Sequence, residues 1–300
     1  MVARPAANAS SPPTVRLEPR TGWARLDLAE VWRARELILM LAMREVRVRY
    51  KQTALGVAWA VLVPLVQMVV FTLIVAVLFG FSSPEGVPFP LFNFAALVPW
   101  AFFSQAVTRS TTSLVARSAL IKKVYLPRTA IPLSAVVTAL VDFALAFVLL
   151  LGMLGLFHLL GPVSIGATRF PEFVWTPGWS VLWVLPMVGL TLITATGVGL
   201  WGSALMVRFR DVGLVIPFVV QVWMYACPII YSMEKLPAWL VPWYSLNPMV
   251  GVIEGFRWAL LGRGDPPWMA TLIAAVISVA VLIGGGYFFR RTERTFADIL

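Results

Sequence analysis

The sequence predicts an all-α integral membrane protein with six transmembrane helices, preceded by an amphipathic interface helix and interrupted on the outer side by re-entrant half-helices. Composition is the first reason, because 60% of the 300 residues are hydrophobic and only 13% are charged, about half the charged share of a soluble domain. The second is that six apolar runs are long enough to cross about 30 Å of hydrocarbon, which takes roughly 20 residues. The third is that Lys and Arg gather in the segments on one side of these runs.

A tail and an interface helix are predicted at the start of the chain. Residues 1–30 are rich in Ala, Pro, Ser and Arg and lack an apolar periodic face, so we expect a mobile cytoplasmic tail there and one transmembrane domain over 31–300. Over 33–52 the sequence predicts a helix with two contrasting faces. The apolar face carries Leu39, Met43, Val46 and Tyr50, and the cationic face carries Arg44, Arg47 and Lys51. Glu45 and Arg49 form an i,i+4 pair. Such a helix lies in the membrane interface and attracts anionic lipid.

Six spans and one re-entrant region are predicted after the interface helix. The spans cover about 55–81, 91–108, 131–158, 181–206, 213–231 and 268–289. The second is the shortest, and Pro99 interrupts it. Residues 235–263 are apolar but broken by prolines, which predicts two half-helices that other parts of the protein cover.

The distribution of positive charge predicts the orientation. Of the 24 Lys and Arg residues, 20 lie in residues 1–54, in the loops 109–130 and 207–212, and in the tail after residue 289. Because cytoplasmic loops carry the excess of Lys and Arg, both termini are expected in the cytoplasm. The formal charge of +10 therefore indicates membrane orientation and not a nucleic-acid partner.

No residue set for bond chemistry is evident. The chain has one histidine, His158, and one cysteine, Cys227, so no catalytic, metal or cofactor site is predicted. It lacks the G-x-x-x-x-G-K-[ST] loop that binds ATP phosphates. Gly197, Gly199 and Gly202 match a dinucleotide-binding pattern, but they lie inside the fourth predicted span, where small residues serve close helix packing.

Five segments in order resemble one family. They are REVRVRYKQTALGVAWAVLVPL, SALIKKVYLPRTAIPLSAVVTALVDF, VRFRDVGLVIPFVVQVWMYACPIIY, LNPMVGVIEGFRWALLG and RRTERTFADIL. They resemble the permease subunits of ABC transporters that export polysaccharides such as O antigen, capsule and teichoic acid, and the resemblance runs from about residue 30 to the end. It implies a homodimer around a pore in the bacterial inner membrane. It also implies a polyprenol-linked polysaccharide as cargo, and a separate cytoplasmic ATPase dimer that binds ATP and Mg.

The resemblance also implies where the ATPase would make contact. The expected coupling residues lie in the interface helix and in two cytoplasmic turns: Arg44, Arg47, Lys51, Lys122, Lys123, Tyr125, Pro127, Arg128, Arg210 and Asp211. The alternative for these cations is ordinary anchoring at the cytoplasmic face.

Aromatic and charged residues within or near the spans are candidates for the cargo path. Flat rings can pack on the C–H faces of sugars, and the candidates are Trp59, Trp100, Phe102, Phe103, Trp201, Trp223 and Tyr225. Alternatively, these rings belong to an interfacial belt or to the bundle core. Asp142, the only acid inside a predicted span, either holds helices together or lies on the path. Glu254 and Arg257, spaced i,i+3, either stabilise the re-entrant region or gate the outer exit.

Other functions remain open at the level of the sequence. The chain could be an ABC permease for drugs or lipids, because the cargo class rests on the resemblance alone. A membrane-embedded glycosyl- or acyltransferase would need paired acids or a histidine base near the lipid face, and the spans offer only Asp142. A secondary transporter would show internal repeats, and none is evident.

Overall fold

A computed structural model of the chain describes residues 28–51, 56, 58–81, 83, 86–123, 126–165 and 168–296. Most of the predicted tail, residues 1–27, lies outside these ranges, as does Tyr125. Within them the chain is mostly helical. Its one sheet pairs β1 (Val163–Ile165) with β2 (Thr168–Phe170) as an antiparallel hairpin in which Val163 faces Phe170. The sequence predicts only helices, so this hairpin was not expected.

Six of the helices overlap the predicted spans. They are α3 (Ala58–Phe71), α4 (Phe89–Ala116), α6 (Ala130–Leu160), α7 (Val184–Arg208), α8 (Val212–Tyr225) and α11 (Trp268–Thr292). The other α-helices of the described residues are α1 (Leu28–Arg33), α2 (Arg35–Lys51), α5 (Ser118–Lys123), α9 (Val241–Ser245) and α10 (Pro248–Leu261). A π-helical segment, Thr72–Leu78, continues α3. Short 3₁₀ turns cover Trp179–Trp183, Met233–Lys235 and Glu293–Thr295.

Five helical segments in the described residues are long and apolar enough to cross a membrane. They are 58–78, 89–116, 130–160, 179–208 and 268–295, so the protein is membrane-embedded. The helix α8 is apolar but has only 14 residues. At 1.5 Å per residue it measures about 21 Å, less than the hydrocarbon thickness. The predicted fifth span extended to residue 231, whereas the helix ends at Tyr225.

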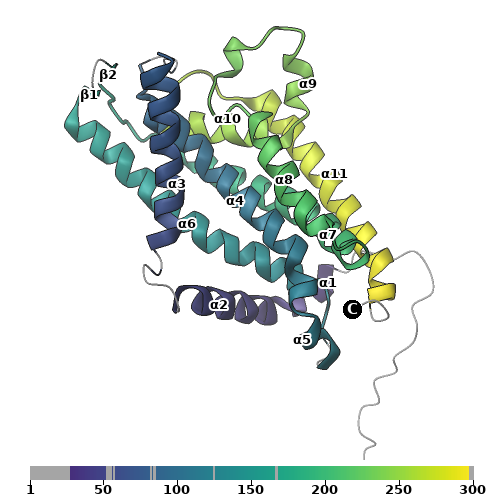
Figure 1. The fold of residues 1–300 in the computed structure, drawn as a ribbon. Helices are drawn as coiled ribbons and strands as arrows, with labels where there is room; N and C mark the ends of the chain where they lie inside the picture. Colours follow the sequence, from purple (N-terminus) through teal and green to yellow (C-terminus); the bar gives the residue numbers. More distant parts are fainter. Residues whose placement is uncertain are drawn as a thin grey trace, which may run out of the picture.

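At the centre of the bundle lies α4, in contact with α3, α6, α7, α8 and α10 (Figure 1). The expectation of a short second span followed by a loop from residue 109 is wrong, because α4 continues through Pro99 to Ala116. Proline is tolerated inside a membrane helix when neighbours satisfy the freed backbone. The second half of α4 contains no Gly or Pro, and its polar residues lower the hydropathy without breaking the helix.

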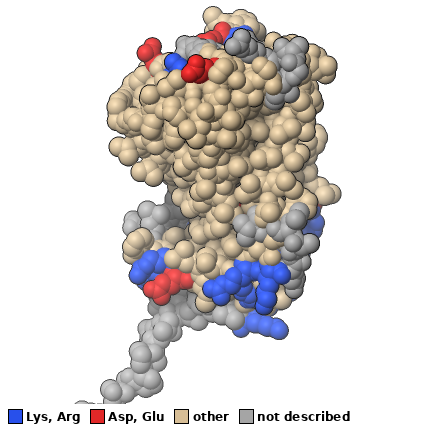
Figure 2. Space-filling view, turned by 90° about the vertical axis from the view of Figure 1, so that its left-hand side faces the viewer, with Lys and Arg blue, Asp and Glu red and all other residues tan. Residues whose placement is uncertain are grey.

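The two ends of the bundle differ in charge. We call the end that carries α2 and α5 the basic end, and the end that carries the hairpin, α9 and α10 the distal end. Figure 1 shows α2 lying crosswise beneath the spans, and it shows α1 and the end of α11 both at the basic end. Figure 2 shows Lys and Arg gathered at the basic end, with a broad band of uncharged residues between it and the charges at the distal end.

Close packing between helices depends on glycines. A Cβ atom on Gly197 would lie 2.7 Å from the backbone nitrogen of Leu282 in α11, and one on Gly199 or Gly202 would meet α4. The prediction that these glycines serve helix packing is therefore confirmed. They bring α7 against α4 on one side and against α11 on another.

Candidate functional site

An ion cluster at the basic end joins α2 to α4 and α6. One face of α2 packs against the chain through Ile38, Leu41 and Ala42, which are buried. Because helix positions three or four residues apart share a face, Glu45 and Arg49 continue that face toward the bundle. Glu45 and Arg49 do form the predicted ion pair, at 3.2 Å.

The centre of the cluster is Asp142 of α6, whose side chain is only 5% exposed. One carboxylate oxygen, Oδ2, lies 2.9 Å from Nη1 of Arg49 and 2.6 Å from Nη1 of Arg109. The hydroxyl of Tyr50 donates a hydrogen bond to the other oxygen, Oδ1. Burial, together with this bond to Asp142, raises the pKa of Tyr50 to about 12, so its hydroxyl remains a donor at neutral pH. These contacts favour the structural role among those considered for Asp142.

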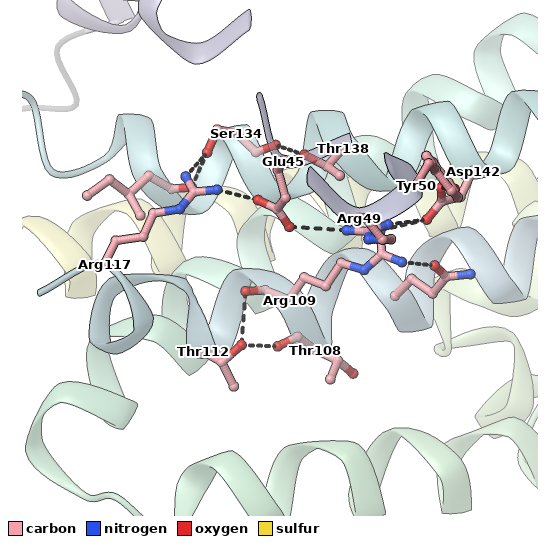
Figure 3. Close-up of polar contacts among 12 residues, drawn as sticks. Glu45, Arg49, Tyr50, Thr108, Arg109, Thr112, Arg117, Ser134, Thr138 and Asp142 are labelled. Carbon is pink, nitrogen blue, oxygen red and sulfur yellow. Dashed lines mark hydrogen bonds and ion pairs between the residues drawn. The ribbon is translucent and has the colours of Figure 1, made fainter. Parts of the chain in front are cut away.

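Glu45 links the centre of the cluster to a second arm. Its carboxylate lies between the guanidinium groups of Arg49 and Arg117, with an ion pair to each. Nη1 of Arg117 also donates to Oγ of Ser134 in α6, at 2.8 Å. Figure 3 shows this chain of contacts running from Arg117 through Glu45 and Arg49 to Asp142.

Electrostatics make the cluster act as one unit. Its three guanidinium groups face two carboxylates, which leaves an excess of one positive charge. Salt screens such pairs less than surface pairs because they are largely buried. Removing one partner of a buried pair leaves an uncompensated charge, which is far more costly than the pair's own net contribution. The ion pairs therefore tie α2 to α4 and α6.

Beside the cluster, a cavity of about 580 Å³ opens between α2 and α5. Its lining includes Arg44, Arg49, Arg117 and Lys123 together with the apolar side chains of Leu41, Val48 and Leu120. Most of the predicted coupling residues are exposed at this end: Arg44, Arg47, Lys51, Lys122, Lys123, Arg210 and Asp211. Pro127 is half-buried. The basic end thus combines an internally paired cluster with an outer layer of exposed cations.

Arg128 differs from the other predicted coupling residues because its side chain is bound to another segment of the same chain. Its guanidinium donates to the backbone carbonyl of Glu293, in the turn that follows α11. Close by, the buried ring of Phe296 packs edge-on against Phe289, with centroids 5.4 Å apart. The segment after α5 and the end of α11 therefore meet at the basic end.

At the distal end, Arg257 supports backbone that is not helical. Its side chain, 5% exposed, forms the predicted pair with Glu254 at 3.1 Å. It also donates to the carbonyls of Ile229, Tyr231 and Phe92. Asn247 donates to the carbonyl of Ala226. These side chains satisfy carbonyl groups just after α8 that no longer belong to a helix.

The aromatic residues of the predicted path lie in different places. Trp100, Phe102 and Phe103 are buried inside the chain. The half-buried ring of Trp223 packs edge-on against Trp100 and Phe103. Trp59, Trp201 and Tyr225 are exposed on three separate helices, and Trp201 stacks on Phe288. The structure therefore brings together three of the seven rings, Trp100, Phe103 and Trp223, whereas Phe102 packs against Phe143 of α6.

Several members of the cluster were missed as site residues. Arg109 and Arg117 were counted only as loop cations, and Tyr50 and Ser134 were given no polar partner. One signal was available, because an acid in a span requires a partner. The stretch SQAVTRSTTS, polar but free of helix breakers, also pointed to a helix that could carry that partner. Among the described residues, no group of three or more His, Cys, Asp or Glu side chains is placed to bind a metal ion.

Comparison with known proteins places these features in a family. Residues 36–261 match the family described as ABC-2 type transporter. The chain is 28% identical to the O-antigen export system permease protein RfbA of Myxococcus xanthus, over 90% of this chain and 97% of that protein. It is 26% identical to the protein of the same name from Klebsiella pneumoniae, over 88% and 95%. It is 24% identical to the polysialic acid transport protein KpsM of Escherichia coli, over 84% and 92%. Since the family match includes α2, the ion cluster and α10 alike, the chain belongs to the ABC-2 type transporter family.

Proposed function

We propose that the chain is the membrane-spanning subunit of an ATP-driven exporter for a lipid-linked polysaccharide. The cargo would be O antigen or a similar cell-surface glycan, moved from the cytoplasm across the bacterial inner membrane. The observation that carries this proposal is the likeness to O-antigen export permeases over nearly the whole length of both chains. The likeness to a polysialic acid transport protein supports the wider class of polysaccharides.

The chain would cross the membrane six times with both termini in the cytoplasm. The excess of cations at the basic end supports a cytoplasmic location for that end. Both ends of the described chain lie there, which requires an even number of crossings. We therefore take α8 together with residues 226–231 as the sixth crossing. Non-helical backbone is tolerated at membrane depth when protein covers it, and Asn247 and Arg257 supply the necessary donors.

Two copies would assemble around the cargo path. The outward sides of α3 and α8 are apolar and exposed: Val63, Val66, Val70, Leu214, Phe218 and Val222. Both helices pack on α4, so a second copy seated against them would enclose the centre of the bundle. In this arrangement Glu254 and Arg257 would lie in the region that closes the outer exit, next to the end of α8.

A separate ATPase would bind the basic end. The sequence contains no P-loop, so ATP and Mg would be held by that partner. Exposed cations on α2 and α5 surround the 580 Å³ cavity and suit a partner with acidic side chains. Force applied to α2 would reach α4 and α6 through Glu45, Arg49 and Asp142.

The first test is co-purification with a candidate ABC ATPase. The double variant Lys122→Glu and Lys123→Glu should lose the partner, because charge reversal at a complementary interface is strongly unfavourable. Arg263→Glu, an exposed site at the distal end, is the matched control and should retain it. Equal recovery of the ATPase with both variants would place its binding surface elsewhere.

The second test concerns the cargo. Depletion of the chain should make a lipid-linked glycan accumulate on the cytoplasmic side, and mass spectrometry of extracted lipids would identify it. Export in vesicles should require the ATPase and ATP. Export without any nucleotide-binding partner would contradict the proposal, and accumulation of a different lipid or a drug would assign the chain another cargo.

A further inference from the structure

The central helix α4 leaves one narrow face open, and that face is polar. Between Phe89 and Leu114, every residue is buried except six. They are Ala101, Ser104, Gln105, Thr108, Arg109 and Thr112. Steps of three and four residues place them on one side of the helix. Five of the six are polar, although α4 lies among apolar membrane-spanning helices.

We call Ser104, Gln105, Thr108 and Thr112 the α4 polar face. It extends from Ser104 to Thr112, which is about 12 Å along the helix axis. Figure 3 shows Thr108 and Thr112 on one side of α4, away from Glu45 and Ser134. On this side Arg109 also donates to the amide oxygen of Gln105 while its guanidinium reaches Asp142.

Some hydroxyl groups of this face lack a hydrogen-bond partner among the described residues. Thr112 donates back to its own helix, to the carbonyls of Thr108 and Arg109, each at 3.3 Å. The hydroxyls of Ser104 and Thr108 make no hydrogen bond with any residue that the structure describes. A polar group facing hydrocarbon without a partner costs free energy. Water or a polar ligand at this face would remove that cost.

The neighbouring helices define where the face lies. On one side is α6, where Phe102 packs against Phe143 with centroids 5.3 Å apart. On the other is α7, where Gly199 and Gly202 approach Ser110 and Thr111. From Phe89 to Trp100 the helix is buried all round, so the open face begins at Ala101 and continues to the basic end. It is therefore accessible from the basic half of the bundle and closed in the distal half.

We propose that the α4 polar face contacts the hydroxyl-rich sugar chain of the cargo, an inference that rests on the proposed function. Hydroxyl and amide groups both donate and accept hydrogen bonds, as sugar hydroxyls do. Ser104, Gln105, Thr108 and Thr112 carry no charge, so they bind a neutral or an anionic glycan weakly at every position. Weak, repeated contacts let a polymer slide without stopping. The distal half of α4 then acts as the closed part of the path in this conformation.

The first arm of the test measures water along the face and needs neither ATPase nor cargo. Cysteines replace Ser104, Thr108 or Thr112 in the full chain in inverted membrane vesicles, and a charged thiosulfonate reagent is added. Because the thiolate attacks the reagent and displaces its sulfinate, and thiols ionise in water but not in hydrocarbon, labelling should be at least about tenfold faster than at lipid-facing controls. The controls are Val148→Cys in α6 and Val276→Cys in α11, at positions 67% and 64% exposed. The native Cys227 is 1% exposed and contributes little background.

The second arm measures export by the assembled transporter. The triple variant Ser104→Ala, Thr108→Val, Thr112→Val removes three hydroxyls with little change in volume. Export should fall about tenfold while dimer assembly and basal ATP hydrolysis are unchanged. Thr108→Ser with Thr112→Ser retains the hydroxyls and should export normally. If the triple variant loses ATP hydrolysis as well as export, that result would also count against cargo contact.

Three outcomes would overturn the inference. Labelling no faster than at Val148 would mean that the face meets lipid. Dissociation of the dimer in the triple variant would assign the face to a helix of the second copy. Normal export by the triple variant would mean that water, but no cargo, touches it. If the chain exports something other than a glycan, the proposed function fails while the labelling result stands, so the two failures are distinguishable.

Discussion

The carboxylate of Asp142 accepts contacts from residues on two other helices, Arg49 and Tyr50 of α2 and Arg109 of α4. A charged carboxylate in a membrane segment is costly unless it is paired. Here two guanidinium groups and one hydroxyl provide the compensation. The same contacts fix the position of α2 against α4 and α6.

Loss of the charge at Asp142 should destabilise the protein. In Asp142→Asn, Tyr50 can still donate to the amide oxygen, but Arg109 loses the carboxylate it is paired with and Arg49 keeps only Glu45. Both arginine side chains are about one quarter exposed, so solvent recovers part of the penalty. We expect a loss of about 2–3 kcal/mol in the free energy of unfolding, measured by thermal or denaturant unfolding in detergent. The control, Glu172→Gln in the exposed distal loop, should leave the free energy of unfolding unchanged. If both variants lose the same stability, the cluster has no specific stabilising role.

At this scale the sequence singled out Asp142, as a residue that either holds helices together or lies on the path, but it did not predict the cluster. The i,i+4 pair of Glu45 and Arg49 followed from helix periodicity. Arg109 lies 33 positions before Asp142, and nothing local specifies that the two helices meet at that level. Tertiary packing of α4 against α6 decides the pairing.

At the scale of elements, the contact between α7 and α11 depends on the absence of side chains. Gly197 and Gly285 face each other so closely that a Cβ on either would overlap the backbone of the other helix. Membrane helices associate through van der Waals packing at small residues, since hydrophobic burial drives little association within lipid. The G-x-G pattern in α7 therefore has a packing role.

Two glycine-to-alanine substitutions in α7 should differ in their effect on stability. Gly197→Ala places a methyl group 2.7 Å from the backbone nitrogen of Leu282, so the helices must separate. Overpacking of this kind costs about 1–3 kcal/mol, which unfolding in detergent would detect. Gly189→Ala meets no atom within 4 Å and should be neutral or slightly stabilising because alanine favours helix. A stable Gly197→Ala variant would mean that α7 and α11 can move apart freely.

At the scale of the whole molecule, composition and charge distribution predicted the class of fold. Long apolar runs are reliable evidence of membrane helices because lipid leaves the backbone few alternatives. Such reasoning could not predict the residue at which α8 ends. Residues 226–230 are as apolar as a helix interior, but Pro228 and the hydrogen bonds from Asn247 and Arg257 hold them in another conformation. The hairpin was missed because its strands have only three residues each.

Cysteine accessibility in cells would test the six-crossing arrangement at α8. Asp211 precedes this helix and Trp239 follows it, and both are exposed. If α8 and residues 226–231 cross the membrane, an impermeant reagent should label Trp239→Cys from outside and Asp211→Cys only in inverted vesicles. Lys123→Cys serves as a second cytoplasmic reference. Labelling of both test positions from the same side would leave five crossings and place the termini in different compartments.

The central position of α4 also has an evolutionary consequence. A helix surrounded by five neighbours can change a side chain only when several other segments change in compensation. Among species that alter their surface glycans under immune or phage pressure, residues 89–100 should accumulate amino-acid substitutions more slowly than the rest of the chain. The lipid-facing sides of α6 and α11 should accumulate apolar substitutions freely, and new cargo preferences should first arise from polar replacements between positions 104 and 112.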